Sequence, residues 1–198
     1  MPRIIGFAGL AGSGKNYAAS LVQRQVFDAE CFAFADPLKQ CCKILFNLSD
    51  DDVYTEEGKK RLTTWPWPNC KPGVGTMTNR DILQVAGTEL IRNNWTQDHW
   101  IRLMERRILS STKKYVLVTD VRFANEAGLI RDMGGLILRM VGRKSEGIPK
   151  HASEVIDFAV DAEIVNNRGI LESDLWLPIK AQITMKWRKS CQTQIQTQ

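Results

Sequence analysis

The chain has 198 residues, of which 43% are hydrophobic and 25% are charged, and its net charge is +5. This length suits one well-cored domain or a domain with a small lid, and the mild positive charge suits an anionic ligand without requiring one. The chain has five scattered cysteines without a C-x-x-C pair and two distant histidines, which argues against a zinc site. It has no signal-like or membrane-spanning stretch, which argues against a secreted protein and a membrane protein. Together with the unpaired cysteines, this predicts a cytoplasmic protein.

The first distinctive feature is an apolar run over residues 4–8, followed by a glycine-rich turn and a helix-like segment from Lys15. The spacing Gly9-x4-Gly14-Lys15 fits a phosphate-binding loop except at its last position. Glycines let the backbone wrap closely around an anion, so the loop amides and the helix N-terminus can face phosphate groups. A turn that merely joins a strand to a helix is the alternative, but the order of the elements favours the phosphate loop. The predicted phosphate-binding residues are Gly9, Ala11, Gly12, Ser13, Gly14, Lys15, Asn16 and Tyr17.

The loop departs from its usual pattern directly after Lys15. The pattern has Ser or Thr there, whose hydroxyl ligates Mg²⁺, whereas this chain has Asn16 followed by Tyr17. An amide oxygen can ligate a hard cation but is not the usual choice, and the tyrosine hydroxyl reaches too far to replace a serine simply. The loop therefore leaves the direct Mg²⁺ ligand open.

Residues 17–27 place their apolar side chains on one helical face, and residues 30–35 predict a second short strand. Asp36 suits a helix N-cap, with Pro37 at the first helical position. Ligands of open α/β sheets bind at the carboxyl ends of strands, so Asp36 and Lys39 are also candidate ligand-binding residues. Both roles stay open for Asp36.

Residues 48–78 do not have the pattern of a core element. They combine an acidic stretch, a basic stretch and the rigid sequence Trp65-Pro66-Trp67-Pro68. We interpret them as an inserted excursion that packs over the site or mediates contacts. Trp65 and Trp67 could stack a nucleotide base, but anchoring of a loop is favoured.

A helix is predicted to begin near Thr78, and another to run through Leu109. The buried face of the first is predicted to contain Ile82, Leu83, Val85, Ala86 and Leu90. Residues 114–120 then form a β-rich apolar run that ends in Asp120, the arrangement of a Walker B strand, whose carboxylate can hold Mg²⁺ or its water shell. Arg122 lies two residues beyond that aspartate, which favours a site role for it over a surface role.

The remaining pattern is a helix over 125–133, strands over 136–141 and 162–165, and a last helix. Leu171, Leu175, Ile179 and Ile183 form the predicted core face of this helix, and Pro178 must lie near its first turn or kink it. The alternation predicts an α/β fold of the P-loop NTPase class, with about five parallel strands flanked by helices. We expect one domain over 1–189, containing the excursion at 48–78 and a lid loop at 142–152, and a disordered tail over 190–198.

Several stretches resemble the tailed-phage deoxynucleoside monophosphate kinases, a branch of the nucleoside monophosphate kinase group of P-loop proteins. The stretches are the loop at 9–17, Phe34-Ala35-Asp36-Pro37-Leu38-Lys39, the block at 83–92, the block at 118–126 and His151-Ala152-Ser153-Glu154. The Gln-x-x-Gly-Thr-Glu and Asp-Val-Arg-Phe sequences within these blocks are far more specific than a lone phosphate loop. The matching blocks are scattered from about residue 4 to residue 154, and the resemblance is not traced through the excursion at 48–78 or the C-terminus.

The resemblance implies an ATP-dependent transferase that converts a deoxynucleoside 5′-monophosphate to the diphosphate, in nucleotide supply for DNA synthesis, with Mg²⁺ as a cofactor. If the chain is of phage origin, its place would be the host cytoplasm. By position, the resemblance puts ATP phosphates on residues 9–17 and the metal on Asp120. It puts the acceptor on Asp36, Lys39, Gln84 and Arg92. It assigns catalysis to Lys15, Asp120, Arg122 and Arg143, the last from a lid-like loop. Relatives usually carry a hydroxyl residue at or just after position 16, so this chain departs from the family there.

Two other functions stay open: a P-loop kinase for another small phosphate acceptor, and a non-catalytic nucleotide-binding accessory in DNA packaging. Asn16 and the basic charge motivate the second, but no helix-turn-helix, zinc finger or basic-aromatic stripe predicts stable nucleic-acid binding. His151, Ser153 and Glu154 are too closely spaced for a catalytic triad. The expected partner is a small-molecule nucleotide. Related folds often dimerise, but these residues do not decide whether the chain forms a homodimer, nor do they decide the base or sugar preference.

Overall fold

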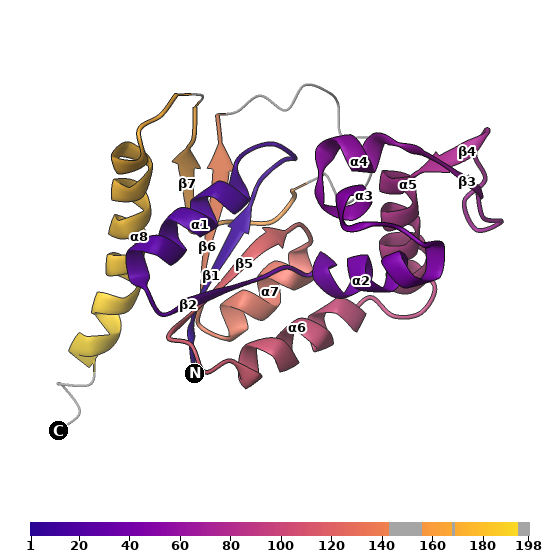
Figure 1. The fold of residues 1–198 in the computed structure, drawn as a ribbon. Coiled ribbons are helices and arrows are strands. Elements are labelled where there is room, and N and C mark those ends of the chain that lie inside the picture. The colour runs from indigo at the N-terminus through magenta and orange to yellow at the C-terminus, as the bar shows by residue number, and fades with distance from the viewer. Residues whose placement is uncertain (143–155, 168, 194–198) are drawn as a thin grey trace. The chain divides into compact units, whose positions relative to one another are not determined.

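The computed structural model describes residues 1–142, 156–167 and 169–193 (Figure 1). The chain divides into two compact units, which are described separately below. The sheet unit comprises Met1–Ala33 and Glu105–Gln198, and the helical unit comprises Phe34–Met104.

Within the described residues, the sheet unit contains one parallel sheet of five strands in the order β2-β5-β1-β6-β7 (Figure 1). The strands are β1 (Arg3–Ala8), β2 (Ala29–Phe32), β5 (Tyr115–Val121), β6 (Leu136–Val141) and β7 (Ala162–Val165). The predicted five-stranded parallel α/β fold is therefore confirmed. After β1 the chain forms β2 and β5 on one side of it, and then β6 and β7 on its other side. The carboxyl end of β1 therefore lies where the strand order reverses. Open α/β sheets bind ligands at such a point.

Helices cover both faces of this sheet because its strands are apolar on both faces. Alternate residues Ile5 and Phe7 pack with α1 (Lys15–Val26) and α8 (Glu172–Thr193) in one core cluster. On the opposite face, Gly6 lies against the Ile130 side chain of α7 (Ala124–Asp132), which occupies the space that a Cβ would need. α6 (His99–Ser110) begins in the helical unit and ends in the sheet unit.

Two details of the sheet unit differ from the expectations. β2 ends at Phe32 rather than near residue 35. In α8, Leu175, Ile179 and Ile183 are buried as predicted, but Leu171 precedes the helix and is exposed. Pro178 lies in the second turn of α8, where it removes the backbone hydrogen bond to Asp174. α8 runs to Thr193 and so includes the first residues of the segment expected as a tail.

The helical unit contains α2 (Ala35–Phe46), α3 (Asp50–Tyr54), α4 (Glu56–Lys60), α5 (Asn79–Gln84) and the two-stranded antiparallel sheet of β3 (Leu62–Pro66) and β4 (Thr76–Thr78). α2 starts before Asp36, and its N-cap is Phe34, without a side-chain cap. The predicted N-cap role of Asp36 is therefore wrong: it lies in the first turn of α2, where a carboxylate still interacts favourably with the helix dipole.

The excursion over 48–78 is more structured than its composition suggests. Val53 is fully buried, and Met77 packs with Cys42, Ile82 and Val85 in the core of the helical unit. The expectation that this segment lacks a core element is therefore wrong for both ends of it. The capping boxes at Ser49 and Thr78, each closed by an aspartate three residues later, explain why α3 and α5 start where they do.

α5 continues directly into a π-helix, η1 (Val85–Asn93). Its i→i+5 hydrogen bonds add one residue to each turn relative to an α-helix, so the buried face rotates along the segment. Thr88 and Arg92 are buried, and as a result of this rotation Leu90, predicted to be buried from α-helical spacing, is 42% exposed. π-helical turns are rare and are frequent at functional sites. No helix in the described part of the chain is long and apolar enough to cross a bilayer.

Candidate active site

The phosphate-binding loop has the backbone that its glycines predict. Gly9, Gly12 and Gly14 have φ values of 142°, 76° and 89°, which residues with a Cβ rarely adopt. A Cβ on Gly9 would lie 2.5 Å from Ser13 Oγ and 2.8 Å from the Met140 carbonyl oxygen, so only glycine fits there. Gly14 is the N-cap of α1, and the loop therefore ends at a helix N-terminus, where backbone amides and the helix dipole favour an anion.

Lys15 closes the loop on itself. Its Nζ donates hydrogen bonds to the carbonyl oxygens of Gly9 at 2.7 Å and Leu10 at 2.8 Å. Its ammonium group therefore lies across the mouth of the loop, where a phosphate oxygen can replace a carbonyl partner. Ser13 donates its backbone N–H to Leu10 at 3.1 Å, which tightens the same turn.

The two residues after Lys15 point in different directions. Asn16 is exposed. Tyr17 Oη donates a hydrogen bond to Glu172 Oε1 of α8 at 3.0 Å, and Arg24 Nη2 donates to the same oxygen at 2.7 Å. The hydroxyl of Tyr17 is thus directed along α1 to α8 and not into the phosphate loop.

Asp120 lies one residue before the end of β5, next to the strand that leads into the loop. The pairing of β1 and β5 shifts between Gly6–Val118 and Ala8–Val121, so β5 has one extra residue around Asp120. A bulge of this kind re-aims a side chain and is common beside active sites. The half-buried Asp120 carboxylate and the glycine-rich loop therefore share the carboxyl-terminal edge of the same pair of strands.

Arg122 follows β5 in a turn that is fixed by Glu126. The buried Glu126 carboxylate accepts the backbone N–H of Arg122 at 2.8 Å and of Phe123 at 3.2 Å. Such charge-assisted bonds to backbone amides are strong, and they start α7. The residue type of Glu126 alone predicts no such role; its position three residues after the helix N-cap is the signal that identifies it.

The proposed acceptor residues all belong to the helical unit. Asp36 and Lys39 lie half-buried on α2, and the Lys39 ammonium stands 4.6 Å from the centre of the Tyr54 ring. Gln84 is the last residue of α5, and Arg92 is 7% exposed in η1. Gly87 brings η1 and α2 into close contact, because a Cβ there would lie 2.6 Å from Leu38 Cδ2. The helical unit thus holds Asp36 and Lys39 on one element and Arg92 on another that packs directly against it.

The two tryptophans of the excursion pack as side-chain anchors. Trp65 meets Phe46 edge to face at 5.4 Å between ring centres, and Trp67 packs on the core of the helical unit and covers Gly73. These contacts support the anchoring interpretation and leave the base-stacking alternative without support from the described residues. Lys71, between this stretch and β4, pairs with Glu89 of η1 at 2.7 Å.

A Mg²⁺–nucleotide complex needs few protein ligands, because phosphates and waters fill most of its coordination sphere. In the part of the chain that the structure describes, no three His, Cys, Asp or Glu side chains gather to form a metal site by themselves. A single carboxylate, Asp120, beside a phosphate-binding loop fits a metal that arrives with its nucleotide. Arg143 and the segment His151-Ala152-Ser153-Glu154 lie outside the described residues.

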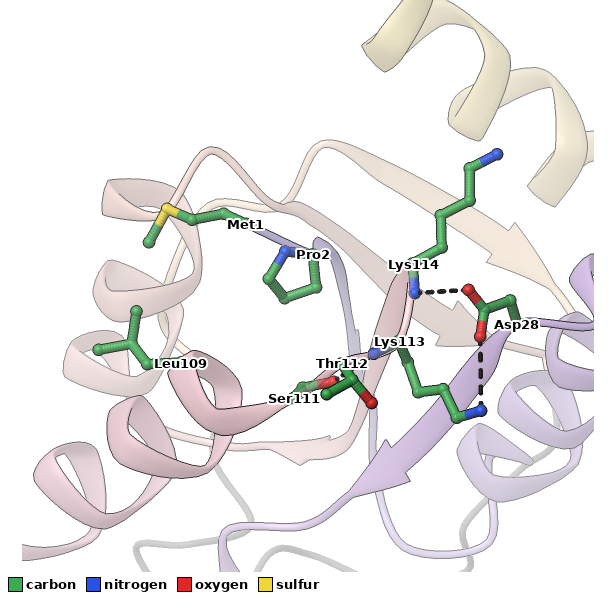
Figure 2. A pocket seen from close by; sticks show the side chains of 8 residues that line it. All are labelled: Met1, Pro2, Asp28, Leu109, Ser111, Thr112, Lys113 and Lys114. Carbon is green, nitrogen blue, oxygen red and sulfur yellow. Dashed lines mark hydrogen bonds and ion pairs between the residues drawn. The ribbon is translucent and has the colours of Figure 1, made fainter.

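A pocket of about 460 Å³ lies at the amino-terminal ends of the strands, opposite the end that carries the phosphate-binding loop (Figure 2). It is lined by residues that precede β1 and β5, including Pro2, Lys113 and Lys114. The Asp28 carboxylate accepts the Lys114 backbone N–H at 3.0 Å and pairs with Lys113 Nζ at 3.5 Å, so the charged groups here already have partners. We assign no chemistry to this pocket, which is remote along the strands from the phosphate loop.

One further residue belongs to the loop, although it lies more than 150 positions away in the sequence. Asn166, directly after β7, is fully buried, and its Nδ2 donates a hydrogen bond to the Ser13 carbonyl oxygen at 2.8 Å. The sequence indicated only a turn at Asn166-Asn167-Arg168-Gly169, because nothing local shows that one of two adjacent asparagines points into the protein.

A family model described as deoxynucleotide monophosphate kinase matches residues 69–190. A protein of Acanthamoeba polyphaga mimivirus, named "Putative deoxynucleotide monophosphate kinase", is 36% identical over 179 residues, which cover 85% of this chain and 91% of that protein. The deoxynucleoside-5′-monophosphate kinase of Escherichia phage T5 is 23% identical over 197 residues, covering 71% and 78%. The APS kinase of Mycobacterium tuberculosis, solved with AMPPNP and APS, has a TM-score of 0.49 and 14% identity, covering 90% of this chain and 96% of that one; this likeness is too weak to bear on function.

Proposed function

The chain belongs to the deoxynucleotide monophosphate kinase family, and on that premise we propose that it transfers the γ-phosphoryl group of ATP to a deoxynucleoside 5′-monophosphate. The products are ADP and the deoxynucleoside diphosphate. The observation that supports this most directly is the phosphate-binding loop after β1, next to the strand that carries Asp120 and is followed by Arg122.

The donor phosphates are assigned to the loop over residues 9–17. Its amides and the N-terminus of α1 face the β- and γ-phosphates, and Lys15 exchanges its hydrogen bonds to Gly9 and Leu10 for bonds to phosphate oxygens. These bonds hold the ammonium at the loop before the nucleotide arrives, which lowers the entropic cost of ordering it on binding.

The acceptor is assigned to Asp36, Lys39, Gln84 and Arg92 of the helical unit. A buried arginine such as Arg92 can bind the 5′-phosphate through two parallel hydrogen bonds, which fixes the acceptor oxygen as well as attracting its charge. Asp36 and Gln84 supply the hydrogen-bond acceptors and donors that a base or sugar needs for recognition.

The transfer step breaks the bond between the γ-phosphorus and the bridging oxygen of ADP and forms one to an oxygen of the acceptor phosphate. That oxygen is already anionic, so no general base is required. The work of the protein is to orient the two phosphates and to offset charge on the transferred group, which Lys15, Arg122 and Arg143 do. Asp120 is the residue that would hold Mg²⁺, directly or through its waters, and the ion would offset part of the phosphate charge.

The test is a coupled assay of ADP release from ATP over a panel of the four deoxynucleoside and four ribonucleoside monophosphates. We expect release with at least one deoxynucleotide and formation of its diphosphate. A panel of other small phosphate acceptors, such as coenzyme precursors, runs in parallel. Turnover only with one of those would replace the proposed acceptor, and no turnover with any acceptor but salt-dependent DNA binding would favour a non-catalytic accessory.

Lys15→Ala provides the matched control for the loop. It should abolish ADP release while leaving the far-ultraviolet circular dichroism spectrum and the unfolding transition intact. If Lys15→Ala keeps full activity, the assignment of the donor phosphates to this loop is wrong.

A further inference from the structure

Asn166 joins the end of the sheet to the phosphate-binding loop. Its backbone N–H donates to the Val141 carbonyl oxygen of β6 at 2.7 Å, and its side-chain Nδ2 donates to the Ser13 carbonyl oxygen at 2.8 Å. The residue is 0% exposed, and Ser13 is 2% exposed. One residue therefore connects the rigid ladder between β6 and β7 to a loop that has no strand neighbour of its own.

The chemistry of the pair fixes the orientation of the asparagine amide. A carbonyl oxygen can only accept a hydrogen bond, so the side chain must present its NH₂ group to Ser13. Asn166 Oδ1 then remains buried, and among the described residues no donor bonds to it. An apolar side chain of the same size would fill this position without that unfavourable burial, so packing alone does not explain an asparagine here.

The bond determines where the next amide points. No cis peptide bond occurs in the described residues, so the Ser13–Gly14 peptide is trans and planar, and its C=O and N–H point in opposite directions. Holding the Ser13 carbonyl on Asn166 directs the Gly14 N–H away from Asn166. Gly14 has φ 89° and ψ 24°, and a glycine at this position can also take the rotated peptide at little steric cost.

We propose that Asn166 is a positioning residue for phosphate binding: it selects the peptide orientation in which the Gly14 amide faces the anion. The inference rests on the proposed function, because it takes the loop to bind the phosphates of ATP. Gly14 allows the loop to take its positive φ, but it would also allow the rotated Ser13–Gly14 peptide. The hydrogen bond from the buried side-chain amide of Asn166 to the Ser13 carbonyl disfavours that rotated peptide. Fixed amide dipoles of this kind stabilise anions because they need no reorganisation on binding.

The test uses two substitutions of nearly the same size and measures ATP binding by calorimetry, without turnover. Asn166→Leu removes the donor and also the unpaired oxygen, but it leaves the buried Ser13 carbonyl without its donor, so its unfolding free energy should stay within about 2 kcal/mol of that of the natural chain. We expect its ATP affinity to fall about tenfold or more. Asn167→Leu is the control: Asn167 is the exposed neighbour in the same turn, and its substitution should leave ATP affinity within about twofold.

Asn166→Asp adds a readout that a packing role would not move. The ionised carboxylate has no donor for Ser13, but the protonated acid has one. The ATP affinity of this variant, relative to the natural chain at each pH, should therefore recover as the pH is lowered from 8 to 5. In ¹⁵N-glycine spectra, the Gly14 amide of Asn166→Leu should also lose the shift that ATP induces in the natural chain.

The possible results separate this inference from the proposed function. ATP binding without phosphorylation of any monophosphate would contradict the proposed function and leave the role of Asn166 intact. Equal ATP affinity in Asn166→Leu and the natural chain would overturn the inference and leave the kinase assignment intact. A fall in thermal stability that accounts for the whole loss of ATP affinity in Asn166→Leu would also overturn it.

Discussion

Tyr17 Oη donates its hydrogen bond to Glu172 Oε1 of α8 at 3.0 Å, and Arg24 donates to the same carboxylate oxygen. α1 and α8, distant in sequence, lie side by side in the sheet unit (Figure 1). The hydroxyl nearest to Lys15 along α1 therefore joins two helices. This relationship directs the Tyr17 hydroxyl away from the loop, and it therefore bears directly on how the metal is held.

We predict that Mg²⁺ depends on Asp120 and not on the residues after Lys15. Asp120→Asn should raise the Mg²⁺ concentration for half-maximal activity about tenfold, because it removes the only carboxylate assigned to the ion. Asn16→Ala should change that concentration by no more than about threefold, and Asn16→Ser should lower it, because a serine restores the usual hydroxyl. A Mg²⁺ titration at saturating ATP measures all three. If Asn16→Ala and Asp120→Asn give the same increase, then the Asn16 amide is a metal ligand.

We predict that Glu126 positions Arg122. Glu126→Ala leaves two backbone N–H groups of the turn without their acceptor, and it should cost about 2 kcal/mol of unfolding free energy. It should also lower kcat about tenfold, because the turn that carries Arg122 loosens. Glu126→Gln keeps an oxygen acceptor and should retain most of the unfolding free energy and most of kcat.

The control, Glu163→Gln, removes only the exposed ion pair with Arg139 at 3.3 Å and should cost less than about 1 kcal/mol of unfolding free energy. Urea unfolding and steady-state kinetics measure these effects; equal losses in Glu126→Ala and Glu126→Gln would contradict a role as acceptor.

Much of the sheet unit follows from local signals. The runs at 4–8, 115–121 and 136–141 are long, apolar and bounded by turn residues, and the glycine spacing at 9–14 determines the loop between β1 and α1. Alternation of strands and helices then requires parallel pairing, which places Asp120 at the same edge as the loop. Family resemblance assigned the acceptor role to Asp36, Lys39, Gln84 and Arg92, which no periodicity indicates.

The features that escaped prediction depend on contacts distant in sequence or on unusual hydrogen bonding. The exposure of Leu90 follows from the π-helix, because α-helical spacing places it seven residues after Leu83 on the predicted buried face. Asn166 reaches Ser13 only because β7 ends beside β6, so its role is invisible until the sheet is built. α2 begins at Ala35, and its N-cap is Phe34, whose side chain cannot cap a helix. The better local candidate, Asp36, lies inside the helix.

We predict that Gly87 sets the distance between η1 and α2 in the helical unit. A Cβ there would lie 2.6 Å from Leu38 Cδ2, the far end of a flexible side chain, so Leu38 has to shift and Gly87→Ala should lose the gain of up to about 1 kcal/mol that alanine brings inside a helix. It should raise the KM for the nucleoside monophosphate and leave the KM for ATP unchanged, because the shift of Leu38 disturbs α2 next to Lys39. Leu38→Ala combined with Gly87→Ala should relieve the overlap and recover part of the acceptor KM.

Gly128 supplies the control for Gly87, since a Cβ on it would meet nothing within 4 Å. Gly128→Ala lies inside α7 and should stabilise the chain by up to about 1 kcal/mol, as alanine does in a helix interior. A Gly87→Ala variant that is as stable as Gly128→Ala, with both KM values unchanged, would show that this contact does not constrain the acceptor residues.

We predict that the adjacent thiols of Cys41 and Cys42 react at very different rates. Cys42 is 1% exposed in the core of the helical unit, and its burial, with a smaller effect from Cys41, raises the pKa of its thiol from 9.0 to about 12. Only the thiolate reacts with iodoacetamide, so at pH 8 the exposed Cys41 should be alkylated and Cys42 should stay unmodified until the chain is unfolded in urea. Because the folded pKa lies above the unfolded one, the neutral thiol favours folding below pH 9, and this contribution is lost as the pH rises from 9 towards 12. Cys42→Ala should therefore show a weaker loss of stability over that interval than the natural chain. Peptide fragmentation resolves the two positions, and equal alkylation of both in the folded chain would contradict the buried position of Cys42.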